Sequence, residues 1–277
     1  MARQSRSKRR SGVVTELKPR DEALLRALGR FRIARTSQIV RLLFQGVRRD
    51  TAAERLRRLY DAGYLDVRSS ERSEENLYAL GAAGKTWLGE HGQVAGSIPR
   101  GGLGHHLDIV EAWVALSDAA HESPLWRLEL FRSDWEIREH TGSSEPLLVP
   151  DALVQLGRRD GTREPLRFAL EVDRGTERPP ELRRKIQLYE QLRTGAEGLF
   201  GWKALGLIVA VDGSGLKRQS ALSTILREEW GSWSLLWSEG RPAGELLGDL
   251  AGLPLEGPLA ARGGMPLQVT EGQGGSS

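Results

Sequence analysis

Cysteine is absent from all 277 residues of the sequence. Its absence excludes structural disulfides and thiolate metal sites, and it is consistent with a reducing compartment. The chain also lacks any apolar run approaching the roughly 18 residues of a membrane helix. The basic N-terminus MARQSRSKRRSG is not followed by the apolar core of a signal peptide. We therefore expect a soluble, cytoplasmic protein with no membrane partner.

The chain has little excess charge of either sign, since the formal net charge is only +3, but its positive and negative residues are unevenly distributed. Arginine and lysine crowd the first 60 positions and acids crowd the middle of the chain. This asymmetry favours an N-terminal part that faces nucleic acid. The alternative is a solvated, arginine-rich surface without a ligand.

Changes in composition divide the chain into four parts. Residues 1–18 are polar, basic and aperiodic, which predicts a disordered arm. Residues 241–277 are rich in Gly and Pro, which predicts a flexible tail with a helical turn at most near residues 245–250. A Gly/Pro cluster at residues 94–104 separates two predicted domains, 19–98 and 104–240.

The first predicted domain has three helical segments followed by two alternating strands. The helices lie at residues 21–31, from Thr36, and from Asp50 or Thr51 to Gly63; the strands are residues 64–68 and 76–80. With the phrase RRLYDAGYL, this order resembles a winged helix-turn-helix. The resemblance implies that the third helix enters the major groove of double-stranded DNA. Four arginines outside its apolar stripe are the candidate DNA contacts: Arg48, Arg49, Arg55 and Arg58. A winged helix used for protein contacts is the alternative.

The second predicted domain contains an acidic hairpin. In FALEVDRGTE (residues 168–177), Glu171 and Asp173 share one strand face, although like charges on one face are destabilising. Asp160 and Gly161 predict a turn that pairs this strand with LLVPDALVQL (residues 147–156), with Ala152 opposite Leu170. Asp151 then lies opposite Glu171. A Mg²⁺ or Mn²⁺ ion would offset the repulsion among these carboxylates. Alternatively, Asp151 only shapes the entrance of its strand.

The elements around this hairpin form a recognisable order. A helix at residues 104–120 precedes a strand at residues 126–137, the acidic hairpin, a helix at residues 179–195 and an apolar strand at residues 204–212. Together with the motifs PD and ExD, this order resembles the PD-(D/E)XK nuclease superfamily. Following a winged helix, it also resembles the replication-relaxation family of plasmid and mobile-element proteins. The expected fold is therefore α+β and multidomain, with a central mixed sheet in the second domain.

The nuclease resemblance implies roles for particular residues. Asp151 and Glu171 match the metal-binding acids, and Glu111 is a candidate for completing the metal shell. Asp173 stands where the nuclease pattern has Lys, so Lys185 is the candidate substitute that assists the attacking water. Lys185 could instead form an ordinary helix pair with Glu181. His105 and His106 are expected to be capping or core residues rather than ligands.

Three functions follow from these features. The first is a DNA-binding protein of a plasmid or mobile element, acting as a replication, mobilisation or relaxation accessory with replication or mobilisation proteins as partners. The second is an active Mg²⁺-dependent DNA endonuclease. The third is a non-catalytic winged-helix transcriptional regulator. Lys at position 173 would have favoured the second, and its absence favours DNA binding. The sequence does not define the oligomeric state.

Overall fold

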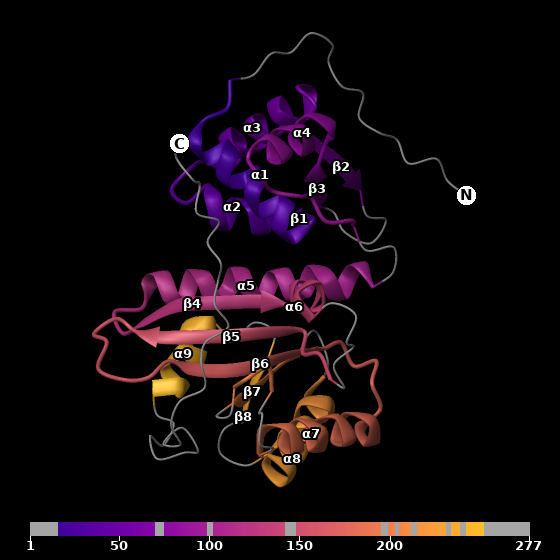
Figure 1. Ribbon diagram of the computed structural model, residues 1–277, viewed down its shortest axis with the longest axis vertical. Helices are drawn as coiled ribbons and strands as arrows, with labels where there is room; N and C mark the ends of the chain where they lie inside the picture. The colour runs from indigo at the N-terminus through magenta and orange to yellow at the C-terminus, as the bar shows by residue number, and fades with distance from the viewer. Residues whose placement is uncertain are drawn as a thin grey trace. The chain divides into compact units, whose positions relative to one another are not determined.

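The computed structural model describes residues 16–69, 75–98, 102–141, 148–194, 199–202, 205–211, 215–230, 234–238 and 242–251 (Figure 1). The chain forms two compact units, unit 1 up to Asp118 and unit 2 from Ala119. The first 15 residues of the predicted arm and residues 252–277 of the predicted tail lie outside the described part. Within that part, no helix is both long and apolar enough to cross a membrane.

Unit 1 combines helices with a small antiparallel sheet. Its elements are α1 (Pro19–Phe31), β1 (Ile33–Arg35), α2 (Thr36–Leu43), α3 (Arg49–Asp61), β2 (Leu65–Ser69), β3 (Asn76–Leu80), α4 (Ala82–Glu90) and most of α5 (Leu103–Glu122). The strand order is β1-β3-β2. The three predicted helices and both hairpin strands are present. The short strand β1 and helix α4 were not predicted, because three residues show no periodicity and α4 has a weak apolar stripe.

The core of unit 1 follows from helical spacing. Leu24, Leu25 and Leu28 of α1 are almost fully buried, as are Leu56 and Leu59 of α3. Residues three or four apart lie on one side of a helix, so each helix contributes an apolar stripe. After α3 the chain turns at Gly63, whose φ of 84° suits glycine because a side chain is disfavoured there. This confirms Gly63 as the predicted end of the third helix.

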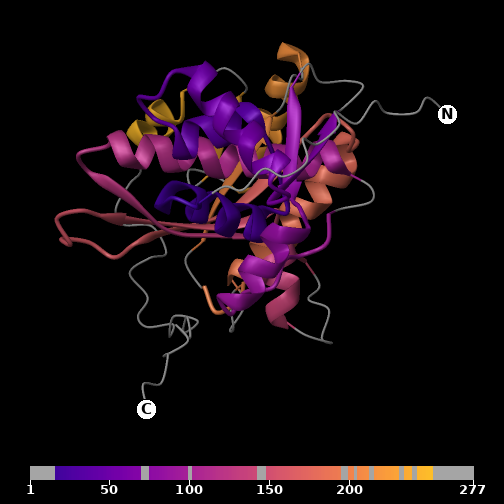
Figure 2. The ribbon, with the colours of Figure 1, turned by 90° about the horizontal axis from the view of Figure 1, so that it is seen from above.

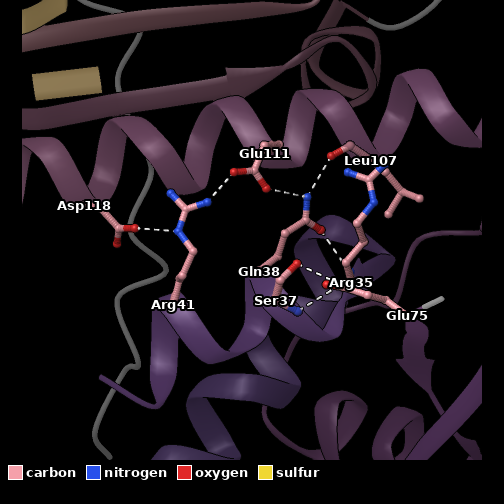
Figure 3. Close-up of polar contacts among 8 residues, drawn as sticks. All are labelled: Arg35, Ser37, Gln38, Arg41, Glu75, Leu107, Glu111 and Asp118. Carbon is pink, nitrogen blue, oxygen red and sulfur yellow. Dashed lines mark hydrogen bonds and ion pairs between the residues drawn. The ribbon is translucent and has the colours of Figure 1, made fainter. Parts of the chain in front are cut away.

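The division between the two units falls within α5, whose residues up to Asp118 belong to unit 1, whereas the sequence placed the start of the second domain at residue 104. Figure 3 shows α5 alongside α2. The buried Gln38 amide donates to the Leu107 carbonyl oxygen at 2.9 Å and to Glu111 at 3.1 Å. Arg41 donates to Glu111 and, at 3.0 Å, to Asp118. Polar groups at helical spacing on both helices therefore face each other.

Apolar and histidine contacts reinforce this attachment of α5. Leu107 packs with Ile33, Leu77 and Ala79 in a buried cluster. The His106 ring is also buried, with Nε2 2.7 Å from the Phe31 carbonyl oxygen, which confirms His106 as a core residue. The Gly/Pro cluster placed the predicted boundary before α5, whereas the polar partners of this helix lie 73 and 77 residues earlier in the chain.

Unit 2 is built around a mixed five-stranded sheet in the order β4-β5-β6-β7-β8. Its elements are β4 (Trp126–Ser133), α6 (Asp134–Thr141), β5 (Ala152–Arg158), β6 (Leu166–Asp173), α7 (Pro179–Thr194), β7 (Gly206–Val211), α8 (Leu216–Glu229), β8 (Ser234–Ser238) and α9 (Ala243–Ala251). β4, β5 and β6 are antiparallel neighbours, whereas β6, β7 and β8 run parallel. The predicted mixed sheet and α+β class are confirmed.

The β5–β6 hairpin has the predicted register. Ala152 pairs with Leu170, Val154 with Phe168, and Leu156 with Leu166. Beyond Leu156 and Leu166 the two strands separate into a wide turn, which lies at one end of the sheet in both views (Figures 1 and 2). The apolar pattern determined this register, since a slip of one residue would exchange the two faces of each strand.

Two further expectations are corrected. The predicted strand at residues 126–137 ends at Ser133, and α6 begins at Asp134. The Glu136 carboxylate accepts hydrogen bonds from Ser133 N at 2.9 Å and Ser133 Oγ at 2.6 Å. The bond from Ser133 N to Glu136 is one of the two bonds of a capping box, and the S-x-x-E spacing typical of that motif is present in the sequence.

The tail, which was predicted to be flexible from residue 241, begins with a helix. Residues Ala243–Ala251 form α9, and Leu246 and Leu247 in it are buried. Leucines at adjacent helical positions cover one side of the helix, which gives it a packing surface. Unit 2 therefore extends at least through α9.

Candidate functional site

The acidic hairpin brings Asp151 next to β6. Asp151 directly precedes β5, and its Oδ2 accepts a hydrogen bond from Val172 N at 2.7 Å. Glu171 and Asp173 lie two residues apart on β6, so they share one face of the strand. Both are buried, with exposed fractions of 5% and 6%. Burial of two carboxylates requires compensating partners, and helices α7 and α8 supply them.

Helix α7 supplies the partners of Glu171. Lys185 Nζ lies 2.5 Å from Glu171 Oε2, and the Tyr189 hydroxyl donates to Oε1. Lys185 and Tyr189 are four residues apart, so both side chains point from the same side of α7. The predicted approach of Lys185 to Glu171 is therefore confirmed. Glu181, the alternative partner of Lys185, accepts hydrogen bonds from Arg178 instead.

The electrostatics of Glu171 reflect its burial. Desolvation and the nearby Asp151 charge raise the pKa of Glu171 to about 8, while Lys185 and Tyr189 act in the opposite direction. Burial lowers the pKa of Lys185, but the Glu171 and Asp151 charges outweigh that effect and raise it. Burial and the Glu171 charge also raise the pKa of Tyr189, which keeps its proton. Negative charge here needs a proton or a cation to offset it, and Lys185 is the cation that the fold supplies.

Asp173 has a partner that was not identified from the sequence. Arg218 on α8 donates from Nε to Oδ2 and from Nη2 to Oδ1, both at 2.8 Å, which is a bidentate guanidinium–carboxylate pair. Gly175 N donates to Oδ1 of the same carboxylate at 3.1 Å. Nothing in the spacing of the sequence connects Asp173 to an arginine 45 residues later, since the contact depends on how α8 packs.

The proposed metal ligands do not fit a divalent ion in this arrangement. Lys185 and Tyr189 bind the two oxygens of Glu171, and Arg218 binds both oxygens of Asp173. Glu111, the candidate third ligand, lies in unit 1, where its carboxylate accepts hydrogen bonds from Arg41 and Gln38. Within the part of the chain that the structure describes, no three Asp, Glu or His side chains gather in a geometry suited to a metal ion.

The four candidate arginines of the third helix fall into two groups. Arg48 and Arg49 are exposed at the start of α3, with 87% of the Arg48 side chain accessible. Arg58 is 60% exposed and pairs with Glu54 one turn earlier, at 2.5 Å. These three arginines are accessible to a polyanion.

Arg55 belongs to the other group, because its guanidinium already has partners within unit 1. Its Nε donates to Asp21 Oδ1 at 2.9 Å, its Nη2 donates to Asp21 Oδ2, and Nη2 also donates to the Glu16 carbonyl oxygen at 2.8 Å. The Arg55 side chain is 19% exposed and that of Asp21 only 2%. Because Asp21 is almost inaccessible to solvent, Arg55 serves as its counter-ion and attaches α3 to α1.

Fold and site together define a two-unit α+β protein with an arginine-bearing helix in one unit and a compensated acidic cluster in the other. The chain belongs to the Replication-relaxation family, whose model matches residues 25–201. That range includes α3 and the Asp151, Glu171 and Lys185 cluster, and it ends before Arg218.

Comparison with other proteins adds little to the family match. No curated protein matches the sequence. A solved structure of the restriction endonuclease FokI is similar with 12% sequence identity and a TM-score of 0.31, over 87% of this chain and 46% of the FokI chain. The chain thus spans less than half of that protein's length, and a TM-score this low does not establish a common fold.

Proposed function

We propose that this protein binds double-stranded DNA through unit 1, which we interpret as a winged helix-turn-helix. The observation that carries the proposal is the element order α1-β1-α2-α3-β2-β3 with strand order β1-β3-β2, combined with exposed arginines on α3. In such domains the helix before the hairpin lies in the major groove, and the hairpin forms the wing. Here that helix is α3.

The charges on α3 suit contacts with the phosphate backbone. Arg48, Arg49 and Arg58 offer guanidinium groups, which donate in pairs to phosphate oxygens. The Arg58–Glu54 ion pair is exposed on both sides, and such pairs contribute little to stability. A phosphate can therefore replace Glu54 as the partner of Arg58 at small cost.

Membership of the Replication-relaxation family supports a role for this binding in the replication or relaxation of plasmid or mobile-element DNA. In that role unit 2 is a platform for DNA or for replication and mobilisation proteins. The ion pairs that hold Glu171 and Asp173 support a structural function for its acidic cluster. The competing function is metal-dependent DNA cleavage, which requires Lys185 to leave Glu171.

A salt titration of DNA binding tests the main proposal. Arg58→Ala should weaken binding of mixed-sequence duplex DNA and lower the slope of log affinity against log salt by about 1, since one phosphate contact is lost. The matched control is Arg227→Ala, which removes an exposed arginine from α8. Equal affinities and slopes for wild type and Arg58→Ala would contradict the placement of α3 in the groove.

A cleavage assay tests the competing function. Supercoiled plasmid incubated with the protein and Mn²⁺ should remain intact. Nicking that disappears in Glu171→Gln would instead establish an endonuclease and overturn the structural interpretation of the cluster.

A further inference from the structure

The contacts of Lys185 differ from those of a surface lysine. Its side chain is only 25% exposed, and Nζ lies 2.5 Å from Glu171 Oε2 and 3.7 Å from Glu177 Oε1. A primary ammonium has three donors and a full positive charge on a compact group. The Lys185 ammonium therefore interacts with two carboxylates, those of Glu171 and Glu177, as a small cation does.

Packing of α7 holds this ammonium in place. Leu182, Ile186 and Tyr189 on the same helix are at most 2% exposed, so the position of the helix against unit 2 is defined by its apolar side. Lys185 lies between these residues in the sequence and points toward β6. Since Tyr189 also donates to Glu171, the helix delivers a cation and a neutral donor to the same carboxylate.

We propose that Lys185 is the built-in counter-ion of the Asp151–Glu171 pair, and that its ammonium takes the place that a divalent cation would otherwise occupy. Wild-type unit 2 then has no affinity for a divalent ion at this cluster, and removal of the lysine creates that affinity. The cost of leaving the buried Glu171 carboxylate, with the half-buried Asp151 carboxylate beside it, without a cation is what would drive uptake of the ion. This inference concerns unit 2 alone and does not depend on DNA binding by unit 1.

Binding of Mn²⁺ to the full-length protein tests the proposal. Electron paramagnetic resonance measures free and bound Mn²⁺, and thermal unfolding measures stabilisation by the ion. Wild type should bind no Mn²⁺ that depends on Glu171. Lys185→Ala should be less stable in chelator and should regain stability on addition of Mn²⁺. It should also show Glu171-dependent Mn²⁺ binding that is at least about tenfold tighter than any residual binding by wild type. The control Lys217→Ala, at an exposed lysine of α8, should behave as wild type.

A third variant assigns the response to the cluster. Combining Glu171→Gln with Lys185→Ala should abolish the Mn²⁺ effect. Either of two outcomes would overturn the proposal: wild type that takes up Mn²⁺ in a manner lost in Glu171→Gln, or a folded Lys185→Ala that shows no Mn²⁺ response. If Lys185→Ala does not fold, the wild-type and Glu171→Gln measurements still decide it, because the proposal excludes Glu171-dependent Mn²⁺ binding by wild type.

Discussion

Replacement of Arg55 by alanine separates the stability of unit 1 from DNA recognition. The substitution leaves the Asp21 carboxylate, whose side chain is 2% exposed, with the Lys18 N–H bond at 2.7 Å and without its guanidinium partner. Removal of one partner from a buried ion pair costs about 3–5 kcal/mol. Because the Arg55 side chain is 19% exposed, we expect the lower end of that range, about 3 kcal/mol.

Urea unfolding followed by circular dichroism measures this loss, and a cycle with Asp21→Asn isolates the pair. The double variant should be no less stable than Arg55→Ala alone, since the unpaired charge is gone. Arg58→Ala is the control on the same helix and should change the free energy of unfolding by less than about 0.5 kcal/mol. DNA affinity of folded Arg55→Ala should stay near that of wild type. An Arg55→Ala protein with unchanged stability and lower DNA affinity would refute this reasoning and return Arg55 to the interface.

Three more outcomes test the structure. Gln38→Leu removes the hydrogen bonds of the buried amide with Arg35 N and with the Leu107 carbonyl oxygen, and it should lower the free energy of unfolding by about 2 kcal/mol. An unchanged urea midpoint would mean that these bonds do not attach α5 to α2. Leu246→Ala should cost about 2–5 kcal/mol because the side chain is fully buried, while a neutral effect in thermal unfolding would show that α9 does not dock. Burial lowers the pKa of His106 below 6.5, so the unfolded chain binds more protons than the folded chain, and stability should fall as the pH drops through 6.5. His106→Gln should make the urea midpoint depend less on pH, and identical pH profiles for the two proteins would contradict this prediction.

The sequence alone determined what rests on local periodicity. Alternation of apolar residues set the register of β5 and β6, since only one register buries Ala152, Val154 and Leu156 together with their partners. Helical spacing likewise identified α3 and placed Lys185 and Tyr189 on one side of α7. These features were predictable because the pattern and the structure extend over the same few residues.

Tertiary structure decided which charges have partners. Arg55 and Arg58 are three residues apart and look alike in the sequence, yet one binds the buried Asp21 of α1 and the other remains exposed. Arg218 reaches Asp173 across 45 residues, and the Glu111 carboxylate accepts hydrogen bonds from Arg41 and Gln38 of unit 1. The pattern of residues around a charged side chain does not identify its partner. The interaction energy of two charges depends on their burial and on the distance between them, and only packing of the whole unit determines both.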